Sequence, residues 1–197
     1  MARMTIDPHM QAIDRFLDED TQLMQRARTD PHAFAPLYEK YFPRIYAYCL
    51  RRLGQAEDAE DMTSLVFTQA FSSLTAYRGG SVAAWLFRIA HNAVASHWRS
   101  HRSARSLDSH AILASLPDER SLEPFTRAET RLEVARLIAT LPEKHQELLA
   151  LTVAGGLSAK EVGQILGKSE GAVWTALHRI VQTLKNAHRQ QEEEEHP

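Results

Sequence analysis

The chain has 197 residues and a formal net charge of −2, with 44% hydrophobic and 24% charged residues. This composition excludes a disordered or fibrous protein and is typical of a globular chain of one or two domains. Glycine and proline are scarce, at 8 residues each, which favours helices over a sandwich of short strands. Proteins that bind DNA alone are usually basic, so a DNA-binding surface here must be local or must be assisted by a larger partner.

The N-terminal part and the cysteine content indicate where the chain works. Residues 1–19 are polar with scattered apolar positions, which predicts a loosely held extension before a first helix over about residues 21–28. Cys49 is the only cysteine, so a disulfide framework is excluded and a reducing compartment is favoured. The sequence contains no signal peptide and no apolar run long enough to cross a bilayer, so we predict a cytoplasmic protein without membrane insertion.

A second, longer helix is predicted to end at about Leu53. Asp30 can cap it, and Pro31 then takes its first position. Pro43 lies inside the helix, so we expect a kink or a break there. The aromatic stripe of this helix, which includes Tyr38, could form a stacking platform, but we interpret it as part of the core.

The third predicted helix begins with dense carboxylates after Gly54. Asp58, Glu60 and Asp61 lie in its first turns, where negative charge interacts favourably with the helix dipole. Dipole compensation and solubility explain these residues without a binding role, whereas an acidic patch facing a basic partner is the functional alternative. No histidine or cysteine lies close in the sequence, which argues against a metal site.

The fourth predicted helix, capped by Ser81, changes from apolar to basic along its length. No acidic residue occurs between Arg88 and Arg105. Basic side chains interleaved with an aromatic ring and an amide suit phosphate contact combined with base stacking or base-edge contact. A solvated basic face without a ligand is the alternative. The residues of this surface include Arg88, His91, Asn92, Trp98, Arg99 and Arg102.

Catalytic and metal sites find little support in the sequence. His97 and His101 are four apart, a separation at which two histidines of one helix can share a metal ion. Their neighbours are arginines, and no carboxylate or cysteine completes a ligand set. No nucleophile, base and orienting acid can be assembled from local spacing either. We therefore predict no catalytic residues, no metal and no cofactor.

The stretch over residues 157–180 has the pattern of two helices joined by a tight turn. Ser158 and Glu161 have the spacing of a capping box at the start of the first helix. Gly167 can end that helix, and Ser169 can cap the next. A longer second helix with outward polar residues describes a helix-turn-helix, whose second helix enters the DNA major groove; an ordinary helical hairpin is the alternative. The outward face of the second helix carries Glu170, Trp174, Thr175, His178 and Arg179.

In this order, the pieces resemble a bacterial RNA polymerase sigma factor of the extracytoplasmic-function group. The start of the second sigma region resembles DPHAFAPLYEKYFPRIYAYCLRRLGQAEDAEDMTSLVFTQAF, and its remainder resembles YRGGSVAAWLFRIAHNAVASHWR. The fourth sigma region resembles LPEKHQELLALTVAGGLSAKEVGQILGKSEGAVWTALHRIVQTLK. The resemblance implies an all-α protein of two small helical domains joined by a flexible linker, with a helix-turn-helix in the C-terminal domain.

The resemblance also implies a function for each part. Sigma domain 2, over residues 20–105, would bind the clamp of core RNA polymerase and would recognise and open the −10 element as a single strand. Sigma domain 4, over residues 128–187, would read the −35 element as duplex DNA. A serine-rich linker at residues 106–127 would join them, and an acidic tail at residues 188–197 is expected to be disordered. An anti-sigma factor is a candidate further partner.

Three sets of residues fall where the family makes its contacts. The polymerase-binding set is Asp58, Glu60, Asp61, Val66 and Phe67. The −10 set is Arg88, His91, Asn92, Trp98, Arg99 and Arg102. The −35 set is Ser169, Gly171, Trp174, Thr175, His178 and Arg179. Relatives favour a basic residue at Trp174, so this tryptophan either faces DNA or packs on its own domain.

Two other functions are alternatives to a transcription initiation factor. In a stand-alone helix-turn-helix regulator, residues 1–105 would be a sensing or dimerising domain, and the basic run over residues 88–105 argues against that. A helical hydrolase using the histidines would need a catalytic constellation that the sequence does not supply. We therefore expect a factor that directs core RNA polymerase to promoters and opens the DNA.

Overall fold

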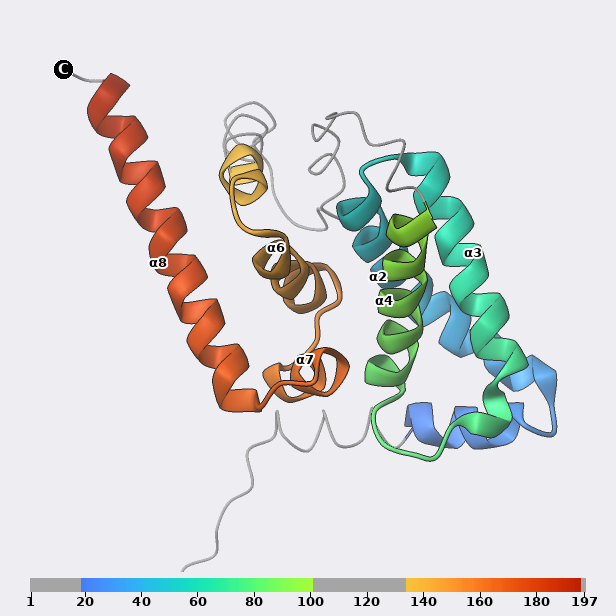
Figure 1. The fold of residues 1–197 in the computed structure, drawn as a ribbon. Helices are drawn as coiled ribbons and strands as arrows, with labels where there is room; N and C mark the ends of the chain where they lie inside the picture. The colour runs from blue at the N-terminus through green and yellow to red at the C-terminus, as the bar shows by residue number, and fades with distance from the viewer. Residues whose placement is uncertain (1–18, 101–133, 196–197) are drawn as a thin grey trace, which may run out of the picture.

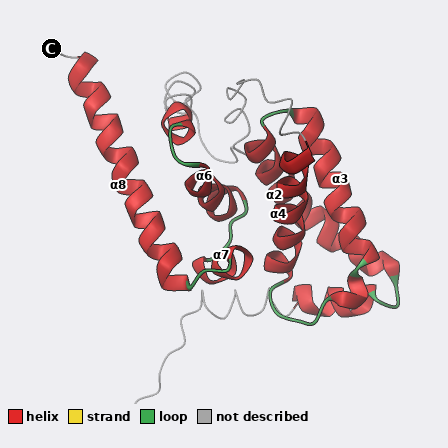
Figure 2. Ribbon diagram, in the orientation of Figure 1, coloured by secondary structure: helices red, strands yellow, loops and turns green. Residues whose placement is uncertain are grey.

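The computed structural model describes residues 19–100 and 134–195. These residues form helices joined by turns and loops, which confirms the predicted all-α class (Figure 2). Figure 1 shows two groups of helices side by side, one ending with α4 and the other ending with α8. The predicted linker at residues 106–127 and Arg102 lie outside the described residues.

The first group is a bundle around three long helices. Its elements are a helical segment over residues 19–27, η1 (Pro31–Phe34), α2 (Ala35–Leu53), α3 (Ala56–Ser72), η2 (Leu74–Ala76) and α4 (Val82–Ser100). Asp30 caps η1 by accepting a hydrogen bond from the backbone N–H of His32 at 3.0 Å. Gly54 ends α2 in the left-handed region, at φ 81°. Ser81 caps α4 by accepting a hydrogen bond from the N–H of Ala84 at 3.1 Å.

We expected a kink or a break at Pro43, and the structure shows that α2 is not broken there. The helix runs through this residue from Ala35 to Leu53. Proline removes one backbone hydrogen bond, but Tyr41 and Ile45 on either side of it are fully or almost fully buried, at 2% and 0% exposure. Packing of this face therefore keeps the chain helical across the proline.

The second group consists of shorter helices and one long one. Its elements are a helical segment over residues 134–139, α6 (Glu143–Leu149), the π-helical turn η4 (Ala150–Ala154), α7 (Ala159–Leu166) and α8 (Glu170–Glu195). The capping box of Ser158 and Glu161 is present, and Gly167 ends α7 in the left-handed region at φ 65°. The pair α7 and α8 therefore forms the predicted helix-turn-helix.

The acidic tail was predicted to be disordered, and this was wrong for most of its length. Helix α8 continues as far as Glu195, beyond the predicted domain end at residue 187. The stretch Gln191–Glu195 contains only glutamine and glutamate, which have good helix propensity, and no glycine or proline that would end a helix. Acidic composition alone therefore did not predict disorder here.

The two groups pack directly against each other. Helix α2 contacts η4, and α4 contacts α7. One continuous cluster of buried side chains includes residues of both groups, such as Tyr48 and Phe87 from the first and Leu148 and Leu151 from the second. This packing decides which faces of α4 and α7 are available for other molecules.

Candidate polymerase and nucleic-acid interface

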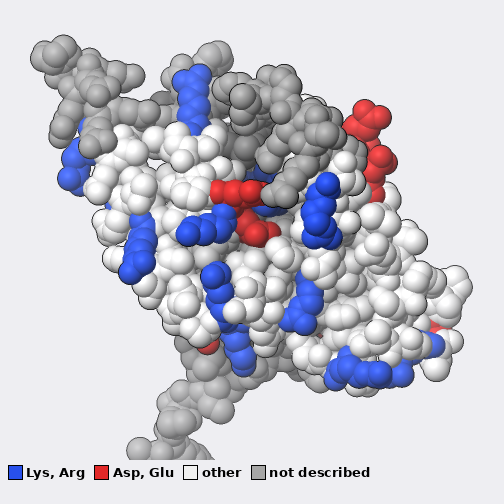
Figure 3. Space-filling view, viewed as in Figure 1, with Lys and Arg blue, Asp and Glu red and all other residues white. Residues whose placement is uncertain are grey.

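The acidic start of α3 lies at the surface. Glu60 and Asp61 are exposed, and Asp58 is half-buried, with its Oδ2 atom 4.0 Å from Nε2 of His97. In Figure 3, acidic side chains stand out at the upper right, over the first turns of α3. This carboxylate cluster can attract a basic surface of another protein.

Val66 and Phe67 do not belong to that surface, contrary to the prediction from the resemblance. Their exposed fractions are 0% and 5%, so they form the core beneath it. The apolar side chains that do reach the surface beside them are Tyr38, Phe42, Leu65 and Phe71, each 37% to 45% exposed. Tyr38, which we interpreted as core, packs its ring 4.6 Å from that of Phe67 and leaves its outer face uncovered.

The predicted −10 residues of α4 divide between two faces of the helix. Arg88 donates a hydrogen bond to the backbone carbonyl of Gln164 at 2.7 Å, and Nδ1 of His91 lies 2.6 Å from Oε1 of Glu147. Both side chains therefore contact the second group of helices. Asn92 and Arg99 are exposed on another part of α4, whereas Trp98 packs against the core.

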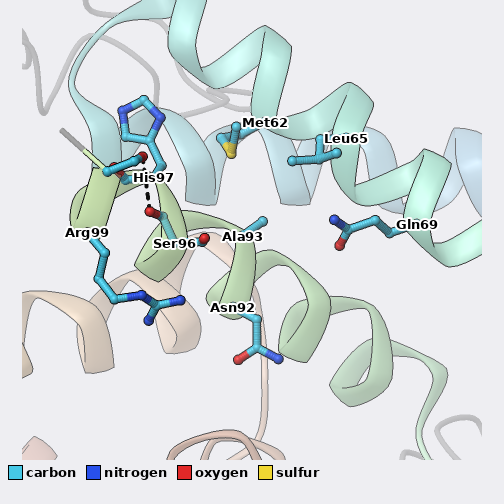
Figure 4. Close-up of a pocket in the computed structure, with 9 residues that line it drawn as sticks. Met62, Leu65, Gln69, Asn92, Ala93, Ser96, His97 and Arg99 are labelled. Atoms are coloured by element: carbon cyan, nitrogen blue, oxygen red, sulfur yellow. Dashed lines mark hydrogen bonds between the residues drawn. The ribbon is translucent and has the colours of Figure 1, made fainter.

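Asn92 and Arg99 line a hollow of about 440 Å³ between α3 and α4. Figure 4 shows Met62, Leu65 and Gln69 on α3 facing α4, with Asn92 and Arg99 projecting from α4. The residues that line the hollow are Met62, Leu65, Gln69, Asn92, Ala93, Ser96, His97, Arg99 and Ser100. Apolar side chains next to an amide and a guanidinium can contact both the face and the edge of an unstacked base.

Of the nine residues that line this hollow, only Asn92 and Arg99 belong to the predicted −10 set. Among the seven others, Ser96 lies one turn beyond Asn92 on α4, and Leu65 and Gln69 come from α3. The helical spacing of Asn92 and Ser96 was a signal that could have identified the serine. The contribution of α3 depends on tertiary packing, which no local pattern in the sequence expresses.

Glu147 is the charged centre of the contact between the groups. It is bound by His91, and the hydroxyl of Tyr48 donates to it at 3.5 Å. Burial alone would raise the pKa of Glu147, but the hydrogen bond from His91 and the charge of Arg52 outweigh it, so the pKa lies below its ordinary value. Burial, together with the charge of Glu147, also raises the pKa of the Tyr48 hydroxyl. Glu147 is therefore a carboxylate at neutral pH.

The outward face of α8 begins with the predicted −35 residues. The Ser169 hydroxyl accepts a hydrogen bond from the N–H of Ala172 at 3.2 Å, and the Thr175 hydroxyl donates a hydrogen bond to the carbonyl of Gly171 at 2.9 Å. Trp174 is 61% exposed, so it does not pack away on its own domain. His178 and Arg179 are exposed on the following turn. An exposed indole on the first turns of such a helix is available to a DNA groove.

Gly163 sets the distance between the two helices of this motif. A Cβ atom at this position would lie 2.6 Å from the carbonyl oxygen of Lys168, closer than such contacts occur. The backbone N–H of Lys168 donates to the carbonyl of Gly163 at 2.9 Å. The turn can therefore close tightly because residue 163 has no side chain, a requirement that we did not predict.

Comparisons with known proteins identify the family of this chain. Residues 37–104 match the family model described as Sigma-70 region 2, and residues 131–184 match Sigma-70, region 4. The chain is 36% identical over 169 residues to the extracytoplasmic-function sigma factor ShbA of Streptomyces griseus, a match that covers 79% of this chain and 87% of ShbA. The chain belongs to the extracytoplasmic-function sigma factors. Members of this family are transcription initiation factors, whose regions 2 and 4 bind core RNA polymerase and promoter DNA.

Other similar sigma factors extend this finding. BldN of Streptomyces coelicolor is 34% identical to this chain over 172 residues, a match that covers 83% of this chain and 63% of BldN. Among solved structures, CnrH in complex with the cytosolic domain of CnrY has a TM-score of 0.64 at 24% identity, covering 87% of this chain and 97% of that one. RpoE of Bartonella quintana, in complex with the anti-sigma factor NepR, has a TM-score of 0.62 at 18% identity, covering 79% and 96%. Both structures confirm the fold.

The described residues of the sigma factor contain neither a metal-binding cluster nor a membrane-spanning helix. Within residues 19–100 and 134–195, no cluster of three or more His, Cys, Asp or Glu side chains is arranged to hold a metal ion. The helices of the same residues include none that is both long and apolar enough to span a bilayer.

Proposed function

We propose that this sigma factor uses three separate surfaces during initiation. The acidic start of α3, with Asp58, Glu60 and Asp61, and the exposed apolar side chains beside it bind the polymerase clamp. The hollow between α3 and α4 holds the unstacked strand of the −10 element, and the outward face of α8 reads the −35 duplex. In this role the protein works in the cytoplasm with core RNA polymerase and has no catalytic residues of its own.

The polymerase surface combines charge with apolar area. Carboxylates on α3 steer a basic partner toward this face, whereas exposed aromatic side chains such as Tyr38 and Phe71 supply the area that a partner can bury. Reversing Asp61 to Lys should weaken binding to core polymerase, while Asp61→Asn should weaken it less. Equal affinity of both variants and the wild type in a core-binding titration, with unchanged thermal unfolding, would contradict this assignment.

The hollow between α3 and α4 carries the proposal most directly. Opening duplex DNA costs roughly 1.4 kcal/mol per base-pair step, and a protein without a motor must recover this from contacts to the unstacked strand. Stacking of a base on an aromatic ring returns about 1–3 kcal/mol, and a guanidinium plane such as that of Arg99 can also stack on a base. Asn92 offers both a donor and an acceptor to a base edge, and Arg99 offers a cation for the adjacent phosphate. The site therefore favours single-stranded over paired DNA.

The test compares two promoter templates in reconstituted holoenzyme. Asn92→Ala should reduce open-complex formation on duplex DNA, and the defect should be smaller on a template already mismatched at −10, where melting is no longer required. Asn186→Ala makes the same chemical change at an exposed position of α8 and should leave both templates unaffected. Equal defects on both templates, or no defect on either, would show that the hollow does not hold the melted strand.

An anti-sigma factor is the further partner that we propose. The structure of the Bartonella RpoE was solved with the anti-sigma factor NepR bound, and that of CnrH with the cytosolic domain of CnrY. This chain has the same fold, and its exposed apolar side chains on α2 and α3 form a surface that such a regulator could cover in competition with the polymerase clamp.

A further inference from the structure

Arg44 of α2 binds the turn that follows η4, which lies 111 residues away in the chain. Its Nε donates a hydrogen bond to the carbonyl of Gly155 at 3.0 Å, and its Nη2 donates to the same oxygen. The Nη2 atom also lies 3.4 Å from the carbonyl oxygen of Gly156. One side chain of sigma region 2 thus binds two successive backbone carbonyls of region 4.

The Arg44 side chain is fixed in place by its own domain. The guanidinium carbon lies 5.1 Å from the ring centroid of Tyr41 and 5.7 Å from that of Phe87. The Tyr41 hydroxyl donates to Asp20 at 2.5 Å, and Lys40 binds the same carboxylate at 2.7 Å. Aromatic faces favour a planar cation, so the arginine is preorganised for its hydrogen bonds.

Gly155 fits this position because it lacks a side chain. A Cβ atom there would lie 3.0 Å from the Phe87 ring and even closer to the carbonyl of Leu151. The turn also follows the C-terminal end of a helix, where the backbone carbonyls carry partial negative charge that attracts a cation. The cation of region 2 and the turn of region 4 are therefore complementary in shape and in charge.

Five more polar contacts between described residues join the same two regions. They are Arg52 to Glu143 at 3.3 Å, His91 to Glu147 at 2.6 Å, Tyr48 to Glu147 at 3.5 Å, Arg88 to the carbonyl of Gln164 at 2.7 Å, and Ser81 to Glu161. Arg88 and His91 belong to the −10 set. In this arrangement region 4 occupies two side chains that region 2 would offer to promoter DNA.

The geometry of a promoter conflicts with this arrangement. The −10 and −35 elements are about 25 positions apart, which corresponds to about 85 Å of B-DNA at roughly 3.4 Å per base pair. Helix α4, which carries the −10 surface, packs directly on α7 of the helix-turn-helix. The two DNA-reading elements cannot reach both sites while they touch, so the regions must separate when the promoter is bound.

We propose that the turn at Gly155–Gly156, held by Arg44, is a latch that keeps the free sigma factor closed. Release of this turn frees Arg88 and His91 and allows regions 2 and 4 to move apart during assembly with core polymerase and promoter DNA. The inference rests on the proposed function, because it assumes that these two regions read the two promoter elements.

Energy transfer between two dyes on the full-length chain tests the latch. Ser72→Cys and Asn186→Cys place exposed attachment sites on the two regions. Burial raises the pKa of Cys49 to about 12, so the native thiol does not compete for the dyes. Arg44→Gln removes the charged hydrogen bonds, and Glu147→Gln weakens a second contact across the same boundary. Arg28→Gln makes the same arginine-to-glutamine change as Arg44→Gln, but at an exposed position away from the boundary, and serves as the control.

We expect high transfer in the wild-type and Arg28→Gln chains and lower transfer in the other two variants, with helix content unchanged. The ratio of open to closed chains should rise about ten-fold for Arg44→Gln, the scale for losing hydrogen bonds to a charged group. Equal transfer in all four chains would overturn the latch, as would low transfer in the wild type. Failure of the wild-type chain to initiate transcription with core polymerase would instead overturn the proposed function and leave the transfer result intact.

Discussion

The two groups of helices differ in how much of their stability each can supply alone. The first group buries large side chains such as Tyr48, Phe87 and Met24 between three long helices. The second group has a smaller core centred on Leu151, Val162 and Ile180, and part of that core is covered by the first group. The first group therefore has the larger core of its own, whereas the second group depends on its neighbour for part of its burial.

A matched pair of core substitutions should expose this asymmetry with the largest effect. Ile45 and Ile180 are buried to the same degree, at 0% and 1% exposure, so replacing either with alanine removes the same atoms. Each change should cost about 2–5 kcal/mol locally. We expect Ile45→Ala to lower hydrogen-exchange protection in both groups, and Ile180→Ala to lower it only in α6–α8. Equal loss of protection throughout the chain in both variants would show that the two groups fold as one unit.

The helix-turn-helix can be disturbed without touching the first group. Gly163→Ala forces a Cβ atom against the carbonyl of Lys168 and should destabilise the second group by about 1–3 kcal/mol, the usual cost of overpacking. Gly171→Ala is the matched control, because a Cβ there meets open space and alanine favours a helix. Thermal unfolding of both variants measures the difference. Similar melting temperatures for the two would mean that the turn relaxes more easily than its contacts indicate.

Reading of the −35 element should depend on an aromatic side chain. Trp174→Ala should reduce promoter discrimination by about 1–3 kcal/mol, the scale for one base-pair contact, without affecting stability, since the indole is mostly exposed. Promoter discrimination is measured by letting promoter duplexes and random duplexes compete for binding to the holoenzyme. If both duplexes lose affinity equally, Trp174 contacts the DNA backbone instead of reading the sequence.

The smallest expected effect comes from acid. Because the pKa of Glu147 is lowered in the folded chain, its interaction with His91 contributes its full stability at pH values above the ordinary pKa of glutamate, about 4.3. That contribution disappears as the pH falls through the lowered value. Energy transfer between the two regions should therefore decrease in acid, and Glu147→Gln should remove this part of the response. An identical acid response in both chains would assign it to other carboxylates.

Local patterns in the sequence predicted much of the fold. Asp30, Gly54, Ser81 and the pair Ser158 and Glu161 act at helix ends, where the chemistry of a few neighbouring residues decides the conformation. The helical periodicity that buries Val173 and Ile180 placed Trp174 on the outward face of the helix, and its 61% exposure excludes the alternative that the indole packs on its own domain.

What the sequence did not predict depends on contacts between distant residues. Arg44 carries no local signal, because its partner is a backbone turn 111 residues away. Val66 and Phe67 occupy polymerase-binding positions by resemblance, yet their direction is set by how α3 packs on α2. The division of the −10 set between two faces of α4 likewise depends on where α7 lies, which periodicity within α4 cannot express.

Glu161 shows how these distant contacts bear on mutational maps of the protein. One carboxylate oxygen closes the capping box by binding the N–H and hydroxyl of Ser158, and the other binds the hydroxyl of Ser81, 80 residues earlier. A substitution at Glu161 therefore changes the start of the helix-turn-helix and the contact between the sigma regions at the same time. Variants at Ser81 and Ser158 should show epistasis, because both serines bind this one carboxylate. A scan of single substitutions would assign the whole defect of a Glu161 variant to DNA binding, although part of it comes from the lost contact between the two regions.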